Sequence, residues 1–467
     1  MTHNVFERMT AAISRQALRY PLGAVASVAG GHIEARGLAH AARLGDRAEI
    51  LWGDGVHPLT AEVIRVQGDL VQLMPEGPAE GLGTGTPVRL CPPPVFAPDL
   101  SWIGRLIDPD GRPLDGRPLL PGLVPRPLNA PPPAAGARRP MGTRMETGSA
   151  VFNTLLPIVR GQRIGLFAGS GVGKSTLLAA LARGVNADVV VIGLVGERGR
   201  EVRHFVDEVL GPEGMARSVV VAATSDRAPQ VRRRAALAAT SVAEHFRDQG
   251  LQVLLLLDSI TRFAEAHREL AVASGEGAGL RGYPASTGPA IAQLCERAGP
   301  GTGASGDITA IYSVLVAGSD MEEPVADMLR GVLDGHTVLD RSIAERGRFP
   351  AVDVLRSVSR SLPHAANVAE NRLITEARQR MAAYDQAELM IQAGLYTTGS
   401  DPAIDAGIAC RDSLETFLTQ SAGNTAAHFA LLRQALNAAQ TGAQPKAQKP
   451  EKKPGTALNR PGQRQPA

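Results

Sequence analysis

GLFAGSGVGKSTLLAALARG, residues 165–184, is the most specific pattern in this chain. Residues 163–167 predict a short buried strand, residues 168–173 a glycine-rich turn, and residues 174–183 an apolar helix that ends at Gly184. A strand, such a turn and a helix beginning with Lys-Ser form the phosphate-binding loop, or P-loop, of nucleoside triphosphatases. The sequence therefore predicts a nucleoside-triphosphate site.

The residues of this P-loop have separate tasks. Its glycines let backbone N–H groups converge on phosphate oxygens, with the N-terminus of the helix behind them. We expect Lys174 to reach the β- and γ-phosphates and the Ser175 hydroxyl to bind Mg²⁺. Ala168 replaces the first glycine of the general pattern G-x-x-x-x-G-K-S/T. The predicted nucleotide-binding residues are Ala168, Gly169, Ser170, Gly171, Val172, Gly173, Lys174, Ser175 and Thr176.

The composition is that of a large globular protein. The chain has 467 residues, of which 44% are hydrophobic and 20% charged, and this length predicts about three domains. No apolar run approaches the ~20 residues that span a bilayer, and the N-terminus lacks a signal-peptide pattern. Cys91, Cys295 and Cys410 are widely spaced, which argues against a disulfide framework or a metal cluster. We expect a cytoplasmic protein, and a net charge of +3 does not by itself indicate nucleic-acid binding.

The P-loop lies in a region of alternating strands and helices. Residues 141–362 contain apolar strands such as ADVVVIGLVG and LQVLLLLD with amphipathic helices between them. Strands that are apolar throughout predict a parallel sheet covered by helices on both faces. Residues 363–440 follow helical patterns, and residues 441–467 are predicted to form a disordered basic tail. The fold class is therefore α/β with a helical C-terminal domain.

Three further segments precede the P-loop region. Residues 23–93 contain short β-type runs separated by glycines, which predicts a small β-barrel. Residues 94–140 form a connector rich in proline and glycine, with little room for regular structure. Residues 1–22 carry apolar side chains near helical spacing. A helix there would either pack on its own domain or dock a partner protein or a membrane surface.

Two carboxylates are candidates for the chemistry of hydrolysis. Asp258 ends the apolar stretch 251–258, where a Walker B residue stands beside a P-loop and orients Mg²⁺ through water. Glu197 in GLVGERGREV follows a predicted strand end, where a carboxylate can lean over the γ-phosphate and polarise the attacking water. A solvated charged loop is the alternative for that second stretch.

Seven motifs then point to one family. In chain order they are LFAGSGVGKS, GERGREV, VLLLLDSITRFAEAHRE, RGYPAS, LDGHTVLDR, GRFPAVDVLRSVSR and GLYTTGSDPAID. With them the chain resembles the flagellar export ATPases, flagellum-specific relatives of the catalytic subunit of rotary ATP synthases, over roughly residues 20–440. The resemblance implies a β-barrel, a RecA-like nucleotide domain and a helical C-terminal domain, assembled as a homohexameric ring.

The resemblance also implies an activity and three residue roles. The activity is Mg²⁺-dependent ATP hydrolysis that energises flagellar protein export. Glu197 occupies the catalytic carboxylate position, which carries Gln in the non-catalytic subunit of the rotary synthases. Phe349 matches an aromatic on which adenine stacks, and Arg360 matches an arginine finger that reaches the neighbouring subunit's site. The expected catalytic residues are Lys174, Glu197 and Arg360, and the expected metal ligands are Ser175 and Asp258.

Partners follow from the same resemblance. They are a regulatory stator-like protein at the N-terminal helix, export chaperones with their cargo, a central stalk protein and the membrane export gate. We therefore expect a cytoplasmic location at the periphery of the inner membrane.

The motifs leave alternatives open. One alternative is the secretion ATPase of a virulence injectisome, although the sequence AGSGVGKS favours the flagellar branch. A second is the catalytic subunit of a rotary ATP synthase, whose acidic C-terminal loop is not evident. A third is a hexameric nucleic-acid translocase, but the barrel region has no aromatic-rich RNA platform.

Overall fold

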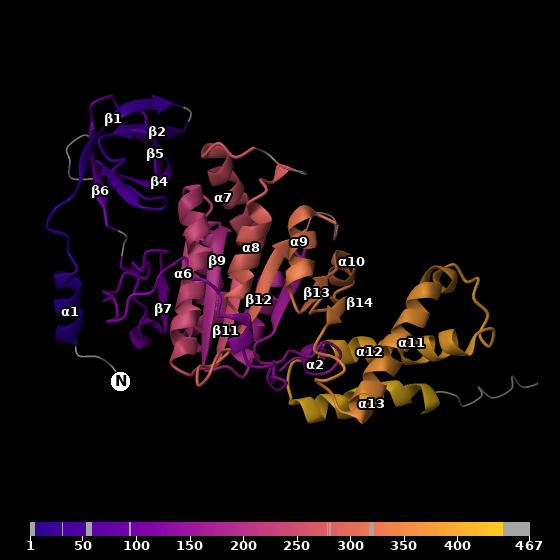
Figure 1. The fold of residues 1–467 in the computed structure, drawn as a ribbon. Helices are drawn as coiled ribbons and strands as arrows, with labels where there is room; N and C mark the ends of the chain where they lie inside the picture. The colour runs from indigo at the N-terminus through magenta and orange to yellow at the C-terminus, as the bar shows by residue number, and fades with distance from the viewer. Residues whose placement is uncertain are drawn as a thin grey trace, which may run out of the picture.

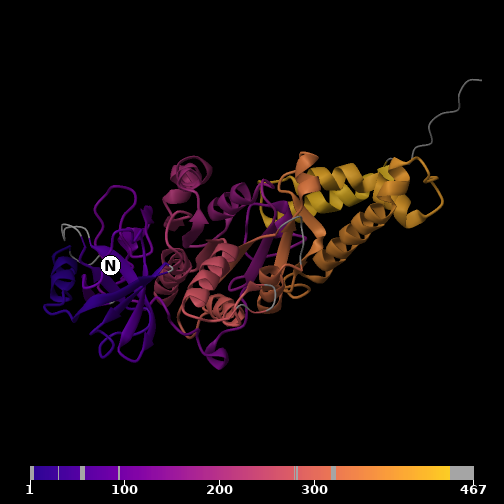
Figure 2. The ribbon, with the colours of Figure 1, turned by 90° about the horizontal axis from the view of Figure 1, so that it is seen from above.

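A computed structural model shows three parts in a row: a barrel, a central sheet with its helices, and a group of C-terminal helices (Figures 1 and 2). This arrangement confirms the predicted fold class. No helix in the described part of the chain is long and apolar enough to cross a membrane. The predicted basic tail lies outside the described residues, apart from its first residue. The structure describes residues 5–29, 31–52, 58–92, 95–277, 279, 282–316 and 322–441.

The N-terminal part is a closed β-barrel. Alternate residues of its strands point inward, as Val71 and Leu73 do in the strand 70–75, because successive side chains of a strand point to opposite faces. The strand order is β1-β2-β5-β4-β3-β6, with antiparallel pairs throughout. The strands are β1 (Leu22–Ala29), β2 (His32–Arg36), β3 (Arg47–Ile50), β4 (Leu59–Gln67), β5 (Leu70–Pro75) and β6 (Pro87–Cys91).

The N-terminal helix α1 (Val5–Ser14) lies against the connector and turns apolar side chains to solvent. Arg8 is buried and pairs with Asp99, with 3.2 Å between Nη1 and Oδ1, while its Nε donates to the Pro121 carbonyl. Arg15 donates to the Leu123 carbonyl at 2.6 Å. The helix thus attaches through its arginines rather than through its apolar residues.

The connector is more regular than its composition suggests. It contains η1 (Leu100–Trp102), η2 (Ala135–Ala137) and the strand β7 (Arg105–Ile107), which pairs in parallel with β10 as the edge strand of the central sheet. A three-residue strand that follows Gly104 is too short to produce a recognisable alternation, so the sequence did not indicate it.

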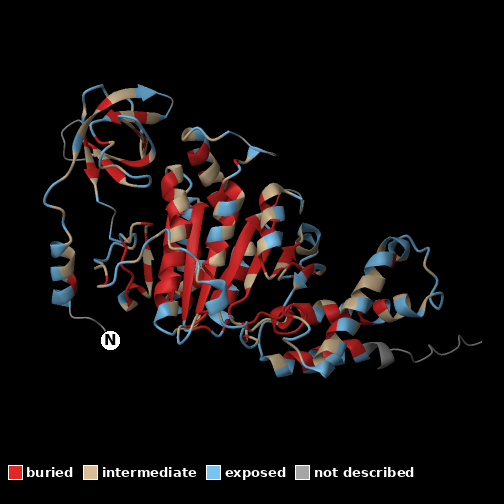
Figure 3. Ribbon diagram, in the orientation of Figure 1, coloured by how far each residue is buried: buried red, intermediate tan, exposed pale blue. Residues whose placement is uncertain are grey.

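The central sheet is parallel, as predicted, except at one edge. Its order is β14-β13-β8-β12-β11-β9-β10-β7, and only β14 runs antiparallel to its neighbour. The strands β8 to β12 are almost wholly buried, whereas the edge strand β14 is only partly so (Figure 3). Besides β7 they are β8 (Arg163–Ala168), β9 (Val189–Glu197), β10 (Ser218–Thr224), β11 (Val253–Asp258), β12 (Ile308–Leu315), β13 (Gly335–Leu339) and β14 (Val352–Ser359).

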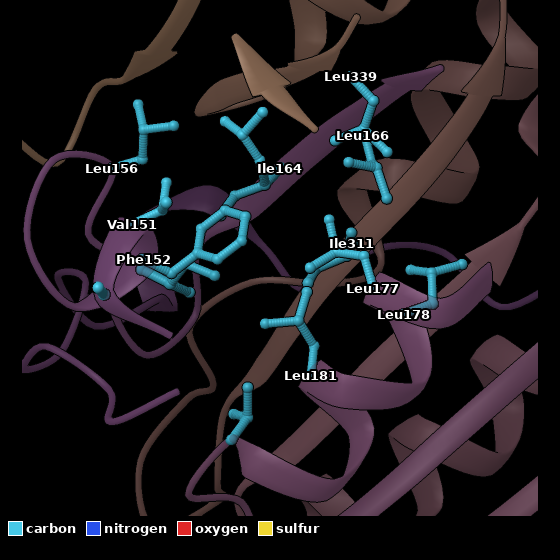
Figure 4. Packing of buried hydrophobic residues seen from close by; sticks show 14 of the residues in the cluster. Val151, Phe152, Leu156, Ile164, Leu166, Leu177, Leu178, Leu181, Ile311 and Leu339 are labelled. Atoms are coloured by element: carbon cyan, nitrogen blue, oxygen red, sulfur yellow. The ribbon is translucent and has the colours of Figure 1, made fainter. Parts of the chain in front are cut away.

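Two apolar cores cover the two faces of this sheet. Neighbouring strand residues belong to different cores: Leu166 packs with α3 and Phe167 packs on the opposite face. Figure 4 shows Leu166 beside Leu177 and Leu178 of α3, with Ile311 of β12 close by. The helices of this part are α2 (Ala150–Asn153), α3 (Lys174–Gly184), α4 (Gly199–His204), the π-helical η3 (Phe205–Leu210), α5 (Gly211–Met215), α6 (Pro229–Asp248), α7 (Ile260–Ala273), α8 (Thr287–Glu296), α9 (Pro324–Val332) and α10 (Arg341–Glu345).

The barrel and the C-terminal helices join the central part differently. A buried ion network holds the barrel: Arg234 of α6 contacts Glu62 of β4 at 2.6 Å, and also Glu76 and Asp110 at 3.2 Å. The C-terminal helices share the apolar core on the α3 face of the sheet, but a cavity of about 600 Å³ separates part of them from the end of α10 and from β14. These helices are α11 (Val368–Gln392), α12 (Pro402–Leu418) and α13 (Thr425–Thr441).

Candidate active site

The P-loop has the geometry that its sequence predicts. It runs from the end of β8 at Ala168 to the start of α3 at Lys174. Gly171 and Gly173 have φ angles of +76° and +85°, in the left-handed region that glycine adopts without strain. No side chain caps the N-terminus of α3, so its first N–H groups are available to an anion.

Lys174 meets two carboxylates that come from other strands. Its ammonium group binds the carboxylate of Asp258, the last residue of β11, and lies 3.9 Å from Oε1 of Glu197, the last residue of β9. Because β9 and β11 are adjacent parallel strands, their carboxyl ends meet at one edge of the sheet. The structure therefore brings together three of the predicted site residues.

Two neighbours of these carboxylates were not identified from the sequence. Ser313 of β12 donates a hydrogen bond of 2.6 Å to Oδ1 of Asp258. Arg262 of α7 lies beside Glu197: the Glu197 carboxylate helps to raise the pKa of Arg262, although Glu265 contributes most. A serine in a buried strand and an arginine in a helix carry no signal of their own. The motif DSITRF, which begins at Asp258, is the one signal that could have indicated Arg262.

The surroundings of Glu197 raise the pKa of its carboxyl group. Burial raises its pKa to about 7, the nearby Asp258 carboxylate acts in the same direction, and Lys174 opposes both. A carboxyl group with a pKa near the working pH is suited to accept a proton from water. The arrangement can therefore supply a general base beside a phosphate-binding loop.

The donors around the P-loop suit Mg²⁺. Ser175 and Thr176 are exposed in the first turn of α3, and Asp258 offers a carboxylate beside Lys174. The residues that the structure describes contain no group of three or more His, Cys, Asp or Glu that could hold a metal. One hydroxyl and one carboxylate fit Mg²⁺, because this ion usually takes one or two carboxylates together with substrate phosphates.

Phe349 lies against the end of the P-loop at Gly173. It follows α10, and about half of its surface (51%) is exposed. A Cβ atom built on Gly173 would lie 3.2 Å from the ring atoms Cδ1 and Cε1, so the ring rests against the P-loop backbone. The structure thus places an exposed aromatic face next to the phosphate loop.

Arg360 lies at the amino edge of the sheet, where the parallel strands begin, and not at the carboxyl edge, where the P-loop lies. Because β14 is antiparallel to β13, its last residue, Ser359, pairs with Gly335, the first residue of β13. Arg360 thus follows at the edge where the parallel strands begin, whereas the P-loop follows the carboxyl end of β8, and the six residues of β8 span about 20 Å. Its guanidinium donates to the carbonyls of Leu333 at 3.0 Å and Arg330 at 3.3 Å, and the residue is exposed. The structure does not bring Arg360 to its own chain's P-loop.

The fold and this site define a P-loop ATPase with a RecA-like sheet. Residues 148–359 match the family described as ATP synthase alpha/beta family, nucleotide-binding domain, and residues 367–438 match the T3SS EscN ATPase C-terminal domain. The flagellum-specific ATP synthase of Caulobacter vibrioides is 47% identical over 85% of this chain and 91% of its own length. The flagellum-specific ATP synthase of Pseudomonas aeruginosa is 42% identical over 89% of this chain and 92% of its own length. The type 3 secretion system ATPase of Xanthomonas euvesicatoria is 40% identical over 90% of this chain and 94% of its own length.

Solved structures agree with these relatives. The assembled ATPase EscN from the type III secretion system of enteropathogenic E. coli aligns with a TM-score of 0.81 and 37% identity, over 89% of this chain and all of that one. EscN in complex with its central stalk EscO aligns with a TM-score of 0.79 and 38% identity, over the same shares. The chain belongs to the ATP synthase alpha/beta family, in the branch of the flagellum-specific ATP synthases and type III secretion ATPases. The resemblance seen in the seven motifs is confirmed.

Proposed function

We propose that this ATPase hydrolyses ATP with Mg²⁺ to energise the export of flagellar proteins. The observation that carries the proposal is the meeting of Lys174, Glu197 and Asp258 beside the P-loop, in a chain that is 47% and 42% identical to two flagellum-specific ATP synthases. The backbone N–H groups of the P-loop and the N-terminus of α3 bind the phosphates. Lys174 exchanges its two carboxylate partners for the β- and γ-phosphates. The ring of Phe349 stacks on the adenine.

Hydrolysis then depends on Glu197 as general base. The carboxylate orients a water molecule toward the γ-phosphate and accepts its proton as the water attacks. Ser175 and Asp258 would hold Mg²⁺, which would supply positive charge to the phosphate oxygens. Ser313 keeps Asp258 oriented through its hydrogen bond. Each of these residues comes from the carboxyl edge of the sheet.

The remaining catalytic group comes from a neighbouring subunit. Arg360 is exposed at the edge of the sheet remote from its own P-loop, which supports an arginine finger that completes the next subunit's site. A closed ring of identical chains completes every site in this way, and we propose the homohexamer that the resemblance implies. The related EscN is described as an assembled ATPase.

One partner surface lies on the N-terminal helix. We propose that a regulatory stator-like protein binds the exposed apolar residues of α1, among them Val5, Met9 and Ile13. A central stalk, export chaperones with their cargo and the membrane export gate complete the set, and the chain works in the cytoplasm at the periphery of the inner membrane. EscN forms a complex with a central stalk, EscO, which supports the stalk for this chain.

The test is a strain that lacks this chain. We expect loss of motility and of secreted flagellar proteins, restored by the native chain and not by a Glu197→Gln chain expressed at the same level. The second candidate is an injectisome ATPase, favoured by the match of residues 367–438 to the EscN C-terminal domain. Normal motility together with loss of secreted virulence proteins would replace the flagellar assignment by that candidate.

A further inference from the structure

The position of the Phe349 ring depends on the backbone that carries it. The ring is about half exposed and rests on Gly173, so its own side-chain packing is limited. On its C-terminal side, Ala351 and Val352 are buried and lead into β14. On its N-terminal side the anchor is Arg348, whose side chain is only 9% exposed.

Arg348 fastens this loop to the C-terminal helices. Its Nε lies 2.7 Å from Oε2 of Glu415 in α12, and its Nη2 donates to the Val352 carbonyl at 3.0 Å. Two residues earlier, Arg346 pairs with Glu388 of α11 at 3.0 Å, in a more exposed position. The loop that presents Phe349 is therefore attached to two helices that are distant in sequence.

The contact between Arg348 and Glu415 lies at the cavity of about 600 Å³. Both residues line this cavity, one from the loop and the other from α12. Glu415 also pairs with Arg411, whose guanidinium stacks over the ring of Tyr384 at 4.7 Å from its centroid. Burial, together with the neighbouring Arg411, lowers the pKa of Arg348 to about 10. Glu415 pairs with both Arg348 and Arg411. Nε and Nη1 of Arg348 have no hydrogen-bond partner among the described residues, so its contact with Glu415 is an ion pair rather than a hydrogen bond.

We propose that Arg348 is a positioning residue: through Glu415 it holds Phe349 against the P-loop and links the base of the nucleotide to the C-terminal helices. The proposal rests on the proposed role of Phe349 as the platform for adenine. Because the cavity leaves α11 and α12 room to shift relative to this loop, movement of these helices changes the position of Phe349. By reciprocity, a bound base restrains the helices, while the phosphates alone do not.

The experiment compares a ligand that has a base with one that has none. Dissociation constants of the full-length chain are measured by calorimetry for the ATP analogue AMP-PNP and for inorganic tripolyphosphate. Arg348→Met is expected to weaken AMP-PNP about 10-fold, the scale of one lost aromatic stack, and to leave tripolyphosphate unchanged. Phe349→Ala is expected to do the same, and the double variant to be no weaker than Phe349→Ala alone. Arg341→Ala, which removes an exposed pair within α10, is the matched control and should change neither constant.

Amide exchange supplies the second readout. AMP-PNP, but not tripolyphosphate, is expected to slow exchange in α12 around Glu415, and Arg348→Met is expected to remove this difference. If Arg348→Met does not fold, as judged by circular dichroism, Arg348→Gln takes its place.

The outcomes separate the two proposals. If Phe349→Ala leaves the ratio of the two constants unchanged, the adenine platform of the proposed function is wrong. If Phe349→Ala shifts the ratio and the Arg348 variant does not, only the positioning role is wrong. Equal weakening of both ligands, or full additivity in the double variant, also overturns that role.

Discussion

The two edges of the central sheet, where its parallel strands end and where they begin, carry different predicted site residues. At the carboxyl edge, Lys174, Glu197 and Asp258 are in contact or near contact and largely shielded from water. At the amino edge, Arg360 is exposed and its guanidinium donates to two backbone carbonyls. The charged groups of Lys174, Glu197 and Asp258 are partly buried together, whereas the guanidinium of Arg360 is exposed on the surface of the chain.

This difference predicts which step depends on the proposed ring. The carboxyl edge can bind a nucleotide in an isolated chain, because its ligands come from β8, β9, β11 and α3 of that chain. Arg360 is separated from this edge by the length of β8, about 20 Å, so it does not reach the P-loop of its own chain. We expect nucleotide binding and hydrolysis to respond differently to assembly.

The largest effect is expected at the amino edge. Arg360→Ala should lower kcat about 10³-fold or more, the scale of arginine fingers, and leave the affinity for nucleotide nearly unchanged. Phosphate release and binding of a fluorescent ATP analogue measure the two quantities. Arg360→Lys should recover only a small part of the rate, because an ammonium group lacks the planar fork of arginine. A normal rate in Arg360→Ala would show that the residues at the carboxyl edge hydrolyse ATP without Arg360.

Mixing two inactive variants sharpens this prediction. Lys174→Ala should abolish nucleotide binding, and Arg360→Ala should abolish catalysis in the neighbour. After their subunits exchange, a site with the P-loop of one and the arginine of the other is complete, so part of the activity should return. Mixed rings no more active than either variant, with full activity of the native chain at dilutions where it is a monomer, would falsify the shared site.

At the carboxyl edge the expected effect is smaller. Glu197→Gln should keep nucleotide binding and lower hydrolysis on the order of 10²-fold or more, the usual scale for a positioned general base. The amide keeps the shape of the side chain but cannot accept the proton. Single-turnover phosphate release measures the chemical step, and an unchanged rate there removes Glu197 from the mechanism.

The pH dependence tests the electrostatics of the same edge. Burial and Asp258 raise the pKa of Glu197 to about 7, and only the ionised form can act as base. Hydrolysis expressed as kcat/KM should therefore fall as the pH drops below about 7, approaching about tenfold per pH unit, and level off above it. The residual activity of Glu197→Gln should lack this inflection. A profile of the native chain that is flat between pH 5.5 and 8 contradicts the assignment.

The smallest effect on hydrolysis is expected for α1, which lies on neither edge. Deleting residues 1–20 should leave basal ATPase activity measurable and abolish co-purification of the regulatory protein. Met9→Ser combined with Ile13→Ser should reproduce the loss of the partner while Arg8 and Arg15 keep the helix in place. An insoluble or unfolded truncated chain would assign the helix to the core instead.

Much of the site was predictable because its signals are local. The strand, glycine turn and helix around Lys174 lie within about twenty consecutive residues. Asp258 ends one apolar strand, and Glu197 ends another. The roles of Phe349 and Arg360 came from the family resemblance and remain predictions, and the structure adds only where they lie. Ser313 and Arg262 were missed, because each becomes part of the site only through strands and helices that the chain brings together.

The sequence alone determined the fold class, the phosphate loop and the two carboxylates, since each depends on the chemistry of neighbouring residues. Only the tertiary structure decided which edge of the sheet each side chain occupies. The antiparallel direction of β14 places Arg360 at the amino edge, and Arg8 turns the apolar side of α1 outward. Such choices depend on pairing between residues far apart in the chain, because strand order and direction are set by which surfaces are buried together.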